Sequence, residues 1–277
     1  MELAIDSFVP NSQIESRWSP PVEITSLEYG SRTLHVARED VLPGGTKQRA
    51  IVPFLVETSA WGPREFIYAG PFCGFAQIAL AYSCHALGLK ARLFCVRDPK
   101  TGGDHEYTRV AEQWGATISL HDSRNAADRA SREYSARQGE KSFLVPLGFA
   151  HPLYLRHLSQ ELTKHMEQLT AVLGPQPRRL WLPVGSGTLA RAFKASLNPA
   201  YWSIVCVDVQ VLPKEDWRIG QLEQTPGLEF MRVPEKFHEP AMLPPSDFPS
   251  NLHYDAKLWR FFSGQAHSGD VWWNVAG

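Results

Sequence analysis

The segment EFIYAGPFCGFAQIALAYSCHALGLKARLFCV, residues 65–96, contains the repeating unit on which the fold is built. Its first six residues read as a strand that ends on Gly70. Residues 73–88 place apolar side chains at helical spacing, and Gly88 is a suitable C-cap. The apolar run 91–96 follows, as expected of a strand that is buried on both faces. The segment therefore predicts a strand–helix–strand unit.

The same alternation continues as far as residue 209. Further strands are predicted at 116–121, 142–148, 179–184 and 202–209, and helices at 107–115, 125–139, 153–174 and from Thr188 onward. Alternating strands and helices predict parallel strands joined by right-handed crossovers, and so an α/β fold. Residues 210–252 are expected to be irregular, because five prolines lie between Pro234 and Pro249. The tail from 254 to 277 is expected to form a helix, a turn and a last strand.

Composition is that of an ordinary soluble enzyme. The 277 residues are 43% hydrophobic and carry a net charge of -1, which gives no electrostatic argument for nucleic acid or a membrane surface. The N-terminus MELAIDSFVPNSQ lacks the pattern of a signal peptide, and no run is long enough to span a membrane, so a cytoplasmic location is expected. The four cysteines are expected to be reduced and mostly buried. The histidines show no metal-ligand spacing, and no metal site is predicted.

Two strand-to-helix junctions are rich in glycine, AGPFCG at 69–74 and VGSGTLA at 184–190. In parallel α/β sheets, ligands bind at such junctions. The GSGT turn at 185–188 could close its backbone N–H groups around an anion, and the helix dipole favours negative charge there. A tight turn with a Ser or Thr cap would use the same residues without any ligand. The sequence leaves both interpretations open.

The second junction also fits a dinucleotide-binding fingerprint. The run from Gly185 to Ala190 matches G-x-G-x-x-A, and Asp208 ends the next apolar strand, where a ribose-binding acid should lie. An NAD-dependent oxidoreductase is therefore one alternative. Against it, little regular pattern follows Asp208. A Walker phosphate loop is excluded because no lysine follows Gly187 at the required place.

Lys47 lies in the segment REDVLPGGTKQR, residues 38–49, with an acidic pair before it and the apolar run AIVPFLVE after it. A lysine that follows two glycines is ordinarily an exposed turn residue. Here the apolar flanks indicate a sheltered amine, an anion cradle lies elsewhere in the chain, and no other residue set supplies a nucleophile. A desolvated lysine has a lowered pKa and becomes usable for Schiff-base chemistry.

These segments resemble, in order, the motifs of the pyridoxal-phosphate enzymes of fold type II, the tryptophan synthase β-like fold. The closest branch is that of D-cysteine desulfhydrase and 1-aminocyclopropane-1-carboxylate deaminase. REDVLPGGTKQR resembles the segment of the cofactor lysine, and residues 69–94 resemble the glycine-rich loop with its helix and strand. FLVPLGFAHPLY, VGSGTLA and YDAKLW resemble the Pro-x-Gly-Gly stretch, the phosphate loop and a helix near the C-terminus. Together these motifs span about residues 38–277.

The resemblance implies two interleaved, open, twisted and mostly parallel sheets flanked by helices. Residues 1–60 and 149–277 would form a large cofactor-binding domain, and residues 61–148 a small substrate-side domain. The resemblance also implies pyridoxal 5'-phosphate as cofactor, a small amino-acid-like substrate and a homodimer. The aromatic residues of the tail offer apolar area either for such a contact or for the core; they are Trp259, Trp272 and Trp273.

Roles for single residues follow from the resemblance. Lys47 would hold the cofactor as an internal aldimine and then act as the base at Cα. Tyr254 would face the reacting centre, or would instead pack as a helix-start aromatic. His151 could reach the pocket, or could lead its helix with structural hydrogen bonds. The phosphate would be bound by Gly185, Ser186, Gly187 and Thr188. The pocket over the substrate carboxylate would be lined by Cys73, Gly74 and Phe75.

Two departures from the family pattern bear on the activity. The family has Ser-Asn where this chain has Cys73-Gly74, and Gly74 cannot replace the asparagine that contacts the phenolic oxygen of the cofactor. The family ends on His-Thr-Gly-Gly, so here Asn274 is the polar candidate for the pyridine nitrogen. The predicted activity is that of a lyase acting by elimination, deamination or decarboxylation. The alternatives are an enzyme that acts on amino-acid-modified thymidine in bacteriophage DNA and a non-catalytic relative that only binds the cofactor.

Overall fold

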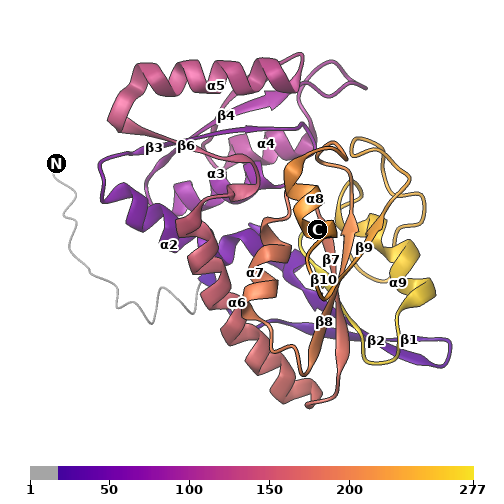
Figure 1. The fold of residues 1–277 in the computed structure, drawn as a ribbon. Coiled ribbons are helices and arrows are strands. Elements are labelled where there is room, and N and C mark those ends of the chain that lie inside the picture. The colour runs from indigo at the N-terminus through magenta and orange to yellow at the C-terminus, as the bar shows by residue number, and fades with distance from the viewer. Residues whose placement is uncertain (1–17) are drawn as a thin grey trace.

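The computed structural model describes residues 18–277. Residues 1–17, on which the argument against a signal peptide depends, lie outside the described residues. The described chain forms a sheet of six strands and a sheet of four, both flanked by helices (Figure 1). The predicted α/β fold class is confirmed, including its two mostly parallel sheets.

The smaller sheet is built from one continuous part of the chain, and all its strands are parallel in the order β5-β4-β3-β6. Its strands are β3 (Glu65–Gly70), β4 (Lys90–Val96), β5 (Thr117–His121) and β6 (Ser142–Val145). Helix α5 (Arg124–Gln138) covers one face, and α3 (Ala76–Ala86) and α4 (Glu106–Gln113) lie on the other (Figure 1).

The larger sheet uses chain on both sides of that part, in the order β1-β2-β10-β7-β8-β9, and only the pair β1–β2 is antiparallel. Its strands are β1 (Ile24–Tyr29), β2 (Arg32–Arg38), β7 (Arg178–Val184), β8 (Trp202–Asp208), β9 (Leu228–Arg232) and β10 (Val271–Asn274). The remaining helices are α2 (Gln48–Ser59), α6 (Pro152–Leu173), α7 (Thr188–Ser196), α8 (Trp217–Glu223) and α9 (Trp259–Gln265). Short 3-10 turns are η1 (Glu39–Val41), η2 (Gly45–Lys47), η3 (Gly139–Lys141), η4 (Leu147–Phe149) and η5 (Asp255–Leu258).

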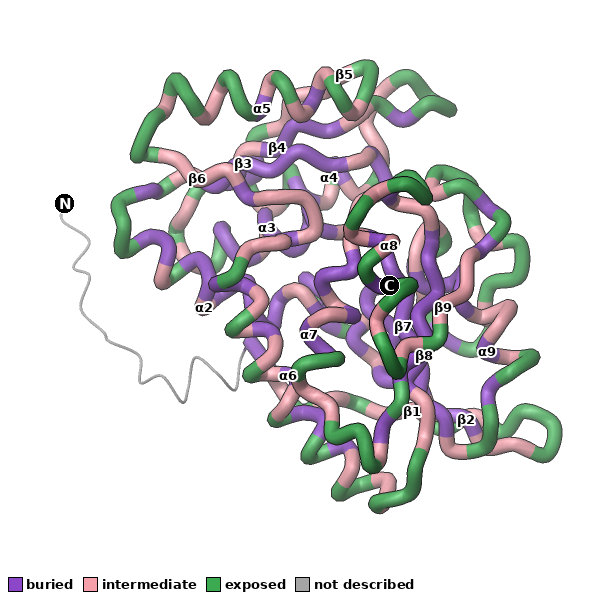
Figure 2. Tube along the Cα trace, viewed as in Figure 1, coloured by how far each residue is buried: buried purple, intermediate pink, exposed green. Residues whose placement is uncertain are grey.

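The side chains of β7 alternate between two apolar clusters. Leu182 packs in the cluster that includes α6 and α7, while Trp181 packs with Phe262 of α9 on the opposite face. Such a strand is covered on both faces, which explains its continuous apolar sequence. The first cluster also includes Phe66 of the smaller sheet, so the two sheets share one core, and buried residues run through both (Figure 2). The strands of the smaller sheet fall within residues 61–148, whose assignment as a separate domain stays a prediction.

Several regular elements occur where the sequence analysis expected none. Strands β1 and β2 form a hairpin whose turn is Gly30-Ser31, and Gly30 supplies the positive φ that this turn needs. The apolar run after Lys47 forms helix α2. The expectation of irregular structure was wrong for α8 and β9, because the cluster of prolines starts only at Pro234. It is confirmed for residues 234–252, which contain no helix or strand.

The aromatic tail and the cysteines lie inside the molecule. Trp272 and Trp273 are fully buried, so of the two interpretations of the tail, the structure supports core packing for this pair. All four cysteines are free and buried, as predicted. Over residues 18–277 no helix is long and apolar enough to cross a membrane. No group of three or more His, Cys, Asp or Glu side chains in that range could hold a metal ion.

Candidate active site

The loops that follow β3, β6, β7, β8 and β10 surround one cavity, at the carboxyl ends of strands from both sheets. It has two adjoining lobes. The α7 lobe lies at the start of α7, and the α3 lobe lies at the loop before α3. Their empty space, which includes space open to solvent, is about 410 Å³ and about 550 Å³. Both lobes are lined by Lys47, Gly148, Gly185, Ser186, Tyr254 and Val275. Carboxyl ends of parallel strands are where ligands bind in such sheets.

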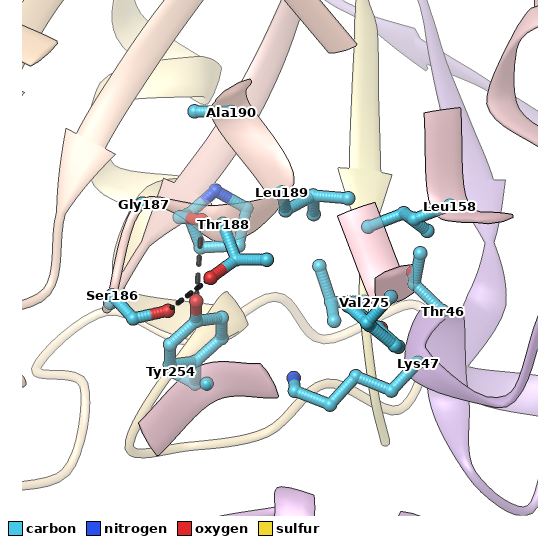
Figure 3. Close-up of a pocket in the computed structure, with 14 residues that line it drawn as sticks. Thr46, Lys47, Leu158, Ser186, Gly187, Thr188, Leu189, Ala190, Tyr254 and Val275 are labelled. Carbon is cyan, nitrogen blue, oxygen red and sulfur yellow. Dashed lines mark hydrogen bonds between the residues drawn. The ribbon is translucent and has the colours of Figure 1, made fainter. Parts of the chain in front are cut away.

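Lys47 ends the turn η2, and its side chain extends into the cavity with its amine on the side of Tyr254 (Figure 3). The preceding Gly45 has φ +58°, and a Cβ there would collide with the Val275 carbonyl oxygen, so glycine is required. Thr46 is held from both sides: its N–H donates to the Val275 carbonyl at 3.0 Å, and its hydroxyl accepts from Trp273 Nε1 at 2.8 Å. The Gly-Thr-Lys sequence thus docks this turn on the end of β10 and directs the amine inward.

The acidic pair that precedes Lys47 is structural. Glu39 is fully buried and forms an ion pair with Arg49 of α2. Asp40 pairs with Arg38 at 2.7 Å and accepts a hydrogen bond from Asn274 Nδ2 at 2.8 Å. The carboxylates therefore fix the loop that carries Lys47, from the side of α2 and from the side of β10.

The local electrostatics of Lys47 are set by burial and by one carboxyl group. Burial lowers the pKa of the Lys47 amine, and Asp255 acts in the opposite direction. Burial raises the pKa of Asp255 well above its usual value. Its Oδ1 accepts from the Val275 N–H at 2.6 Å, whereas its buried Oδ2 has no hydrogen-bond partner. Asp255 was missed by the sequence analysis, since a carboxylate one position after Tyr254 has no recognisable spacing to Lys47.

The GSGT turn forms the other wall of the α7 lobe. Gly187 is the N-cap of α7 with φ +78°, a left-handed conformation that favours glycine. The Ser186 and Thr188 hydroxyls lie 3.0 Å apart (Figure 3). The first N–H groups of a helix have no partner within it, so this turn presents donors and positive potential together. The structure thereby brings Lys47 and residues 185–188 to one cavity.

Two further residues adapt the cavity around this turn. Gly148 has φ +66°, and a Cβ there would collide with the Ser186 hydroxyl, so the loops after β6 and β7 approach as closely as their backbones allow. Arg191 donates from Nη2 to the Ser186 carbonyl at 3.2 Å, and its Nη1 is buried without a partner. Neither was predicted from the sequence as a site residue, although Gly148 lies in the stretch FLVPLGFAHPLY.

The predicted substrate-side residues Cys73, Gly74 and Phe75 all line the α3 lobe. Burial raises the pKa of the Cys73 thiol to about 12, so it is neutral near pH 7. Gly74 donates its N–H to the Pro71 carbonyl at 3.2 Å, and an added Cβ would meet the Pro71 ring at 3.1 Å. The loop is therefore a compact turn that offers backbone groups, a thiol and a phenyl ring.

Tyr254 lines both lobes and packs against both apolar clusters, so both of its predicted roles have contacts that fit them. Its hydroxyl donates to the Pro183 carbonyl at 3.4 Å (Figure 3). A Cβ at Gly185 would lie 3.0 Å from its ring, so this glycine lets the ring rest on the turn. Burial raises the pKa of Tyr254, which keeps its hydroxyl protonated.

Two predicted contacts are not found. His151 does not line either lobe; its Nδ1 accepts from the Leu153 N–H at the start of α6, and its ring packs on Phe54. Asn274 is fully buried outside both lobes, and its amide binds Asp40 and the Pro249 carbonyl. The hydrogen bonds of both side chains stabilise the fold.

The dinucleotide interpretation is not favoured. Asp208 is fully buried, pairs with Arg232 at 2.8 Å and accepts from the Gln210 N–H, so it is not presented to a ribose. Among the described residues, none that lines the cavity specifically favours a modified nucleotide or a non-catalytic protein.

Comparisons with solved structures place the fold. The chain is similar to an ACC deaminase homologue (TM-score 0.71, 14% identity, 94% of this chain and 90% of that chain). It is similar to a threonine deaminase from T.th. (TM-score 0.67, 14% identity, 96% of each chain) and to a pyridoxal 5'-phosphate-dependent aspartate racemase (TM-score 0.64, 12% identity, 92% and 89%). No protein-family model matches the chain, and no curated sequence matches it significantly. The fold is therefore the tryptophan synthase β-like fold.

The residues present fit the cofactor that this fold implies. The α7 lobe offers hydroxyls and helix N–H groups for a phosphate, with the unpartnered Arg191 Nη1 beside the turn. An amine with a lowered pKa lies in the same cavity, near a buried carboxyl oxygen without a partner. Arg191 and Asp255 do not line either lobe, so the match to a phosphorylated aldehyde rests on the turn at 185–188 and on the Lys47 amine.

Proposed function

We propose that the chain binds pyridoxal phosphate through Lys47 and acts as a lyase on an amino acid or amino-acid-like substrate, by elimination, deamination or decarboxylation. One observation carries the proposal: the Lys47 amine and the Gly185–Thr188 turn, far apart in sequence, line the same cavity. The similarity of the fold to those of two deaminases is consistent with this proposal. We further propose that the chain is related to the branch of D-cysteine desulfhydrase and ACC deaminase.

Bound pyridoxal phosphate supplies an electron sink for negative charge on the substrate Cα. Lys47 would hold it through the side-chain amine. Once the amino group of the substrate has taken its place on the cofactor, the freed Lys47 amine, whose pKa burial lowers, would be suited to accept the proton from Cα. The N–H groups and hydroxyls of residues 185–188 bind the phosphate. Residues 73–75 face the substrate carboxylate, and the protonated Tyr254 hydroxyl is available as a proton donor.

The test is spectroscopic. Purified protein is incubated with pyridoxal phosphate, dialysed and scanned in the near visible, then treated with borohydride. Wild type should gain a yellow absorbance that borohydride removes, and mass spectrometry should locate the reduced adduct on Lys47. Lys47→Ala should gain none. Lys194→Ala is the control, because this lysine is exposed on α7 and should leave the spectrum unchanged.

Activity is then measured as release of ammonia, keto acid or carbon dioxide from a panel of free amino acids and from amino-acid-modified thymidine. Colourless protein that binds nicotinamide dinucleotide would contradict the proposal in favour of the oxidoreductase. Yellow protein that turns over no compound would leave the non-catalytic alternative. A preference for the modified thymidine over every free amino acid would replace the proposed substrate class.

A further inference from the structure

The α3 lobe contains one basic side chain, that of Lys47. Its other walls are largely apolar, with Phe75, Leu147, Val211, Phe237 and Val275 among them. Burial raises the pKa of each other titratable residue of the lobe, namely Tyr68, Cys73 and Tyr254. These three groups are therefore neutral near pH 7. Among the described residues, no aspartate, glutamate, arginine or histidine lines the lobe.

We propose that the substrate carries an uncharged, apolar side chain, aliphatic, thioether or aromatic, and that Phe237 is the residue that selects it. This inference rests on the proposed function, because it assigns the α3 lobe to the substrate. In the proposed function the Lys47 amine is joined to the cofactor, so a charged side chain placed in this lobe would lose its hydration without gaining a counter-charge. An apolar side chain would gain by leaving water and contacting the walls.

Phe237 lies at the end of the segment 233–237. The backbone carbonyl groups of this segment accept hydrogen bonds from two side chains. Gln210 Nε2 donates to the carbonyls of Val233 at 2.7 Å and Glu235 at 3.1 Å. Lys257 Nζ donates to the carbonyls of Lys236 at 2.7 Å and Phe237 at 3.3 Å. Two side chains thus fix four carbonyls of a segment that has no regular secondary structure of its own over 234–237.

Gln210 and Lys257, which anchor this segment, are both in energetically unfavourable arrangements. Gln210 has φ +62°, which is uncommon for a residue other than glycine. Lys257 is only 1% exposed, and its Nζ stands 5.7 Å from the centre of the Phe237 ring. A buried amine that binds only neutral carbonyls is costly. The position of Lys257 accounts for this cost: Lys257 lies in η5, two residues after Asp255 and three after Tyr254, so one turn connects the Phe237 wall to the cavity. Lys257 is a positioning residue for Phe237.

The experiment uses the protein loaded with pyridoxal phosphate and follows its near-visible absorbance as amino acids are added. The probes are both enantiomers of leucine, methionine, phenylalanine, alanine, aspartate and lysine. The best apolar probe should half-saturate the change at a concentration at least ~10-fold lower than aspartate or lysine, the discrimination that a few methylene contacts provide. Phe237→Ala should weaken binding of that apolar probe by ~10-fold and of alanine by less than ~2-fold.

Lys257→Met tests the positioning role, and it should reproduce the affinity pattern of Phe237→Ala. Arg260→Met is the matched control, because Arg260 binds Glu235 of the same segment at 3.2 Å but does not hold the carbonyl of Phe237. It should leave the ratio of apolar to alanine affinity unchanged. Since Phe237 is only partly buried, Phe237→Ala remains a test even where Lys257→Met does not fold.

Aspartate or lysine binding as tightly as the apolar probes would overturn the inference, as would a Phe237→Ala variant that weakens alanine and leucine equally. Calorimetry on protein without added cofactor separates this failure from that of the proposed function. Protein that takes up no cofactor but prefers apolar amino acids contradicts the proposed function alone. Protein that takes up cofactor and prefers charged amino acids contradicts this inference alone. Protein that binds neither contradicts both.

Discussion

Two strand-to-helix turns line the cavity, one after β3 in the smaller sheet and one after β7 in the larger sheet. The turn at 185–188 has a left-handed glycine and two hydroxyls that lie 3.0 Å apart at the start of a helix. The turn at 71–76 has a buried thiol, a phenyl ring and a glycine, Gly74, whose N–H is bound within the turn. The first is suited to an anion. In the second, the thiol and the phenyl ring are suited to a neutral or apolar substrate side chain, beside the backbone groups proposed to face the substrate carboxylate.

This difference shows that the topology determines the position of the two turns, whereas the side chains determine the chemistry of each lobe. Parallel strands bring both turns to the same edge of their sheets, whatever residues they carry. The chemistry of each lobe then depends on a few side chains, which is why the fold alone does not assign a substrate. The variants below test this separation, in order of decreasing expected effect.

Gly148→Ala should have the largest effect on cofactor affinity. A Cβ at this position would displace the Ser186 hydroxyl, and overpacking of this kind costs up to about 3 kcal/mol, or ~100-fold in affinity. Gly88→Ala is the control: its φ of +64° is nearly the same as the +66° of Gly148, but an added Cβ meets nothing within 4 Å. Equal loss of cofactor affinity in both variants would mean that backbone strain, and not the approach of the two loops, is responsible.

Lys257 should make the stability of the protein rise above pH 8. Burial lowers the pKa of its amine from 10.5 to about 8, so between these values the unfolded chain binds more protons than the folded one. Stability then increases with pH, by about 2 kcal/mol between pH 8 and 10. Denaturant unfolding of wild type and Lys257→Met over this range measures the difference between them, which removes the groups that titrate in both. A constant difference would show that folding does not lower the pKa of Lys257.

The fold was largely predictable from the sequence because its information is local. The apolar runs of β3, β4, β7 and β8 and the amphipathic pattern of α6 each specify an element by themselves. The misses also have local causes. Helix α2 contains Pro53, and its run AIVPFLVE is apolar without a clear period, so no helix was assigned. Elements α8 and β9 are short and lie just before a proline-rich segment. The prolines of that segment led to the prediction of irregular structure over all of residues 210–252.

The site was predictable only where its residues lie in a pattern that a motif records. Lys47 and the turn at 185–188 each belong to such a pattern, and both line the cavity. Asp255 and Gly148 lie in the quoted stretches YDAKLW and FLVPLGFAHPLY, but their contacts with Lys47 and Ser186 depend on distances between loops that are far apart in sequence, which the motifs do not report. Asn274 shows the opposite error: a polar residue at a plausible position binds Asp40 instead, because the amide of a buried residue takes the nearest partner.

Ser186→Ala and Cys73→Ala should distinguish the roles of the two turns, the first in cofactor affinity and the second in amino-acid affinity. Loss of a hydroxyl that binds a charged phosphate costs roughly 1.5 kcal/mol, so Ser186→Ala should weaken cofactor affinity by ~10-fold. Cys73→Ala removes a neutral thiol from the α3 lobe, and it should leave cofactor affinity within ~2-fold and alter amino-acid affinity instead. Equilibrium dialysis with pyridoxal phosphate measures the first quantity. If Cys73→Ala weakens cofactor binding as much as Ser186→Ala, the two lobes do not have separate roles.

Tyr254→Phe should have only a small effect on cofactor affinity, although Tyr254 lines both lobes. Its hydroxyl donates to the Pro183 carbonyl at 3.4 Å, a long and therefore weak hydrogen bond, and the ring that rests on Gly185 is kept in the variant. Because burial raises the pKa of Tyr254, the substitution removes no charge from the cavity. We expect cofactor affinity to change by less than ~3-fold, in line with the net value of one weak hydrogen bond. Dialysis at several pH values between 6 and 9 provides the check. A larger loss, or one that grows with pH, would mean that the hydroxyl binds the phosphate side directly, and Tyr254 would then belong with residues 185–188.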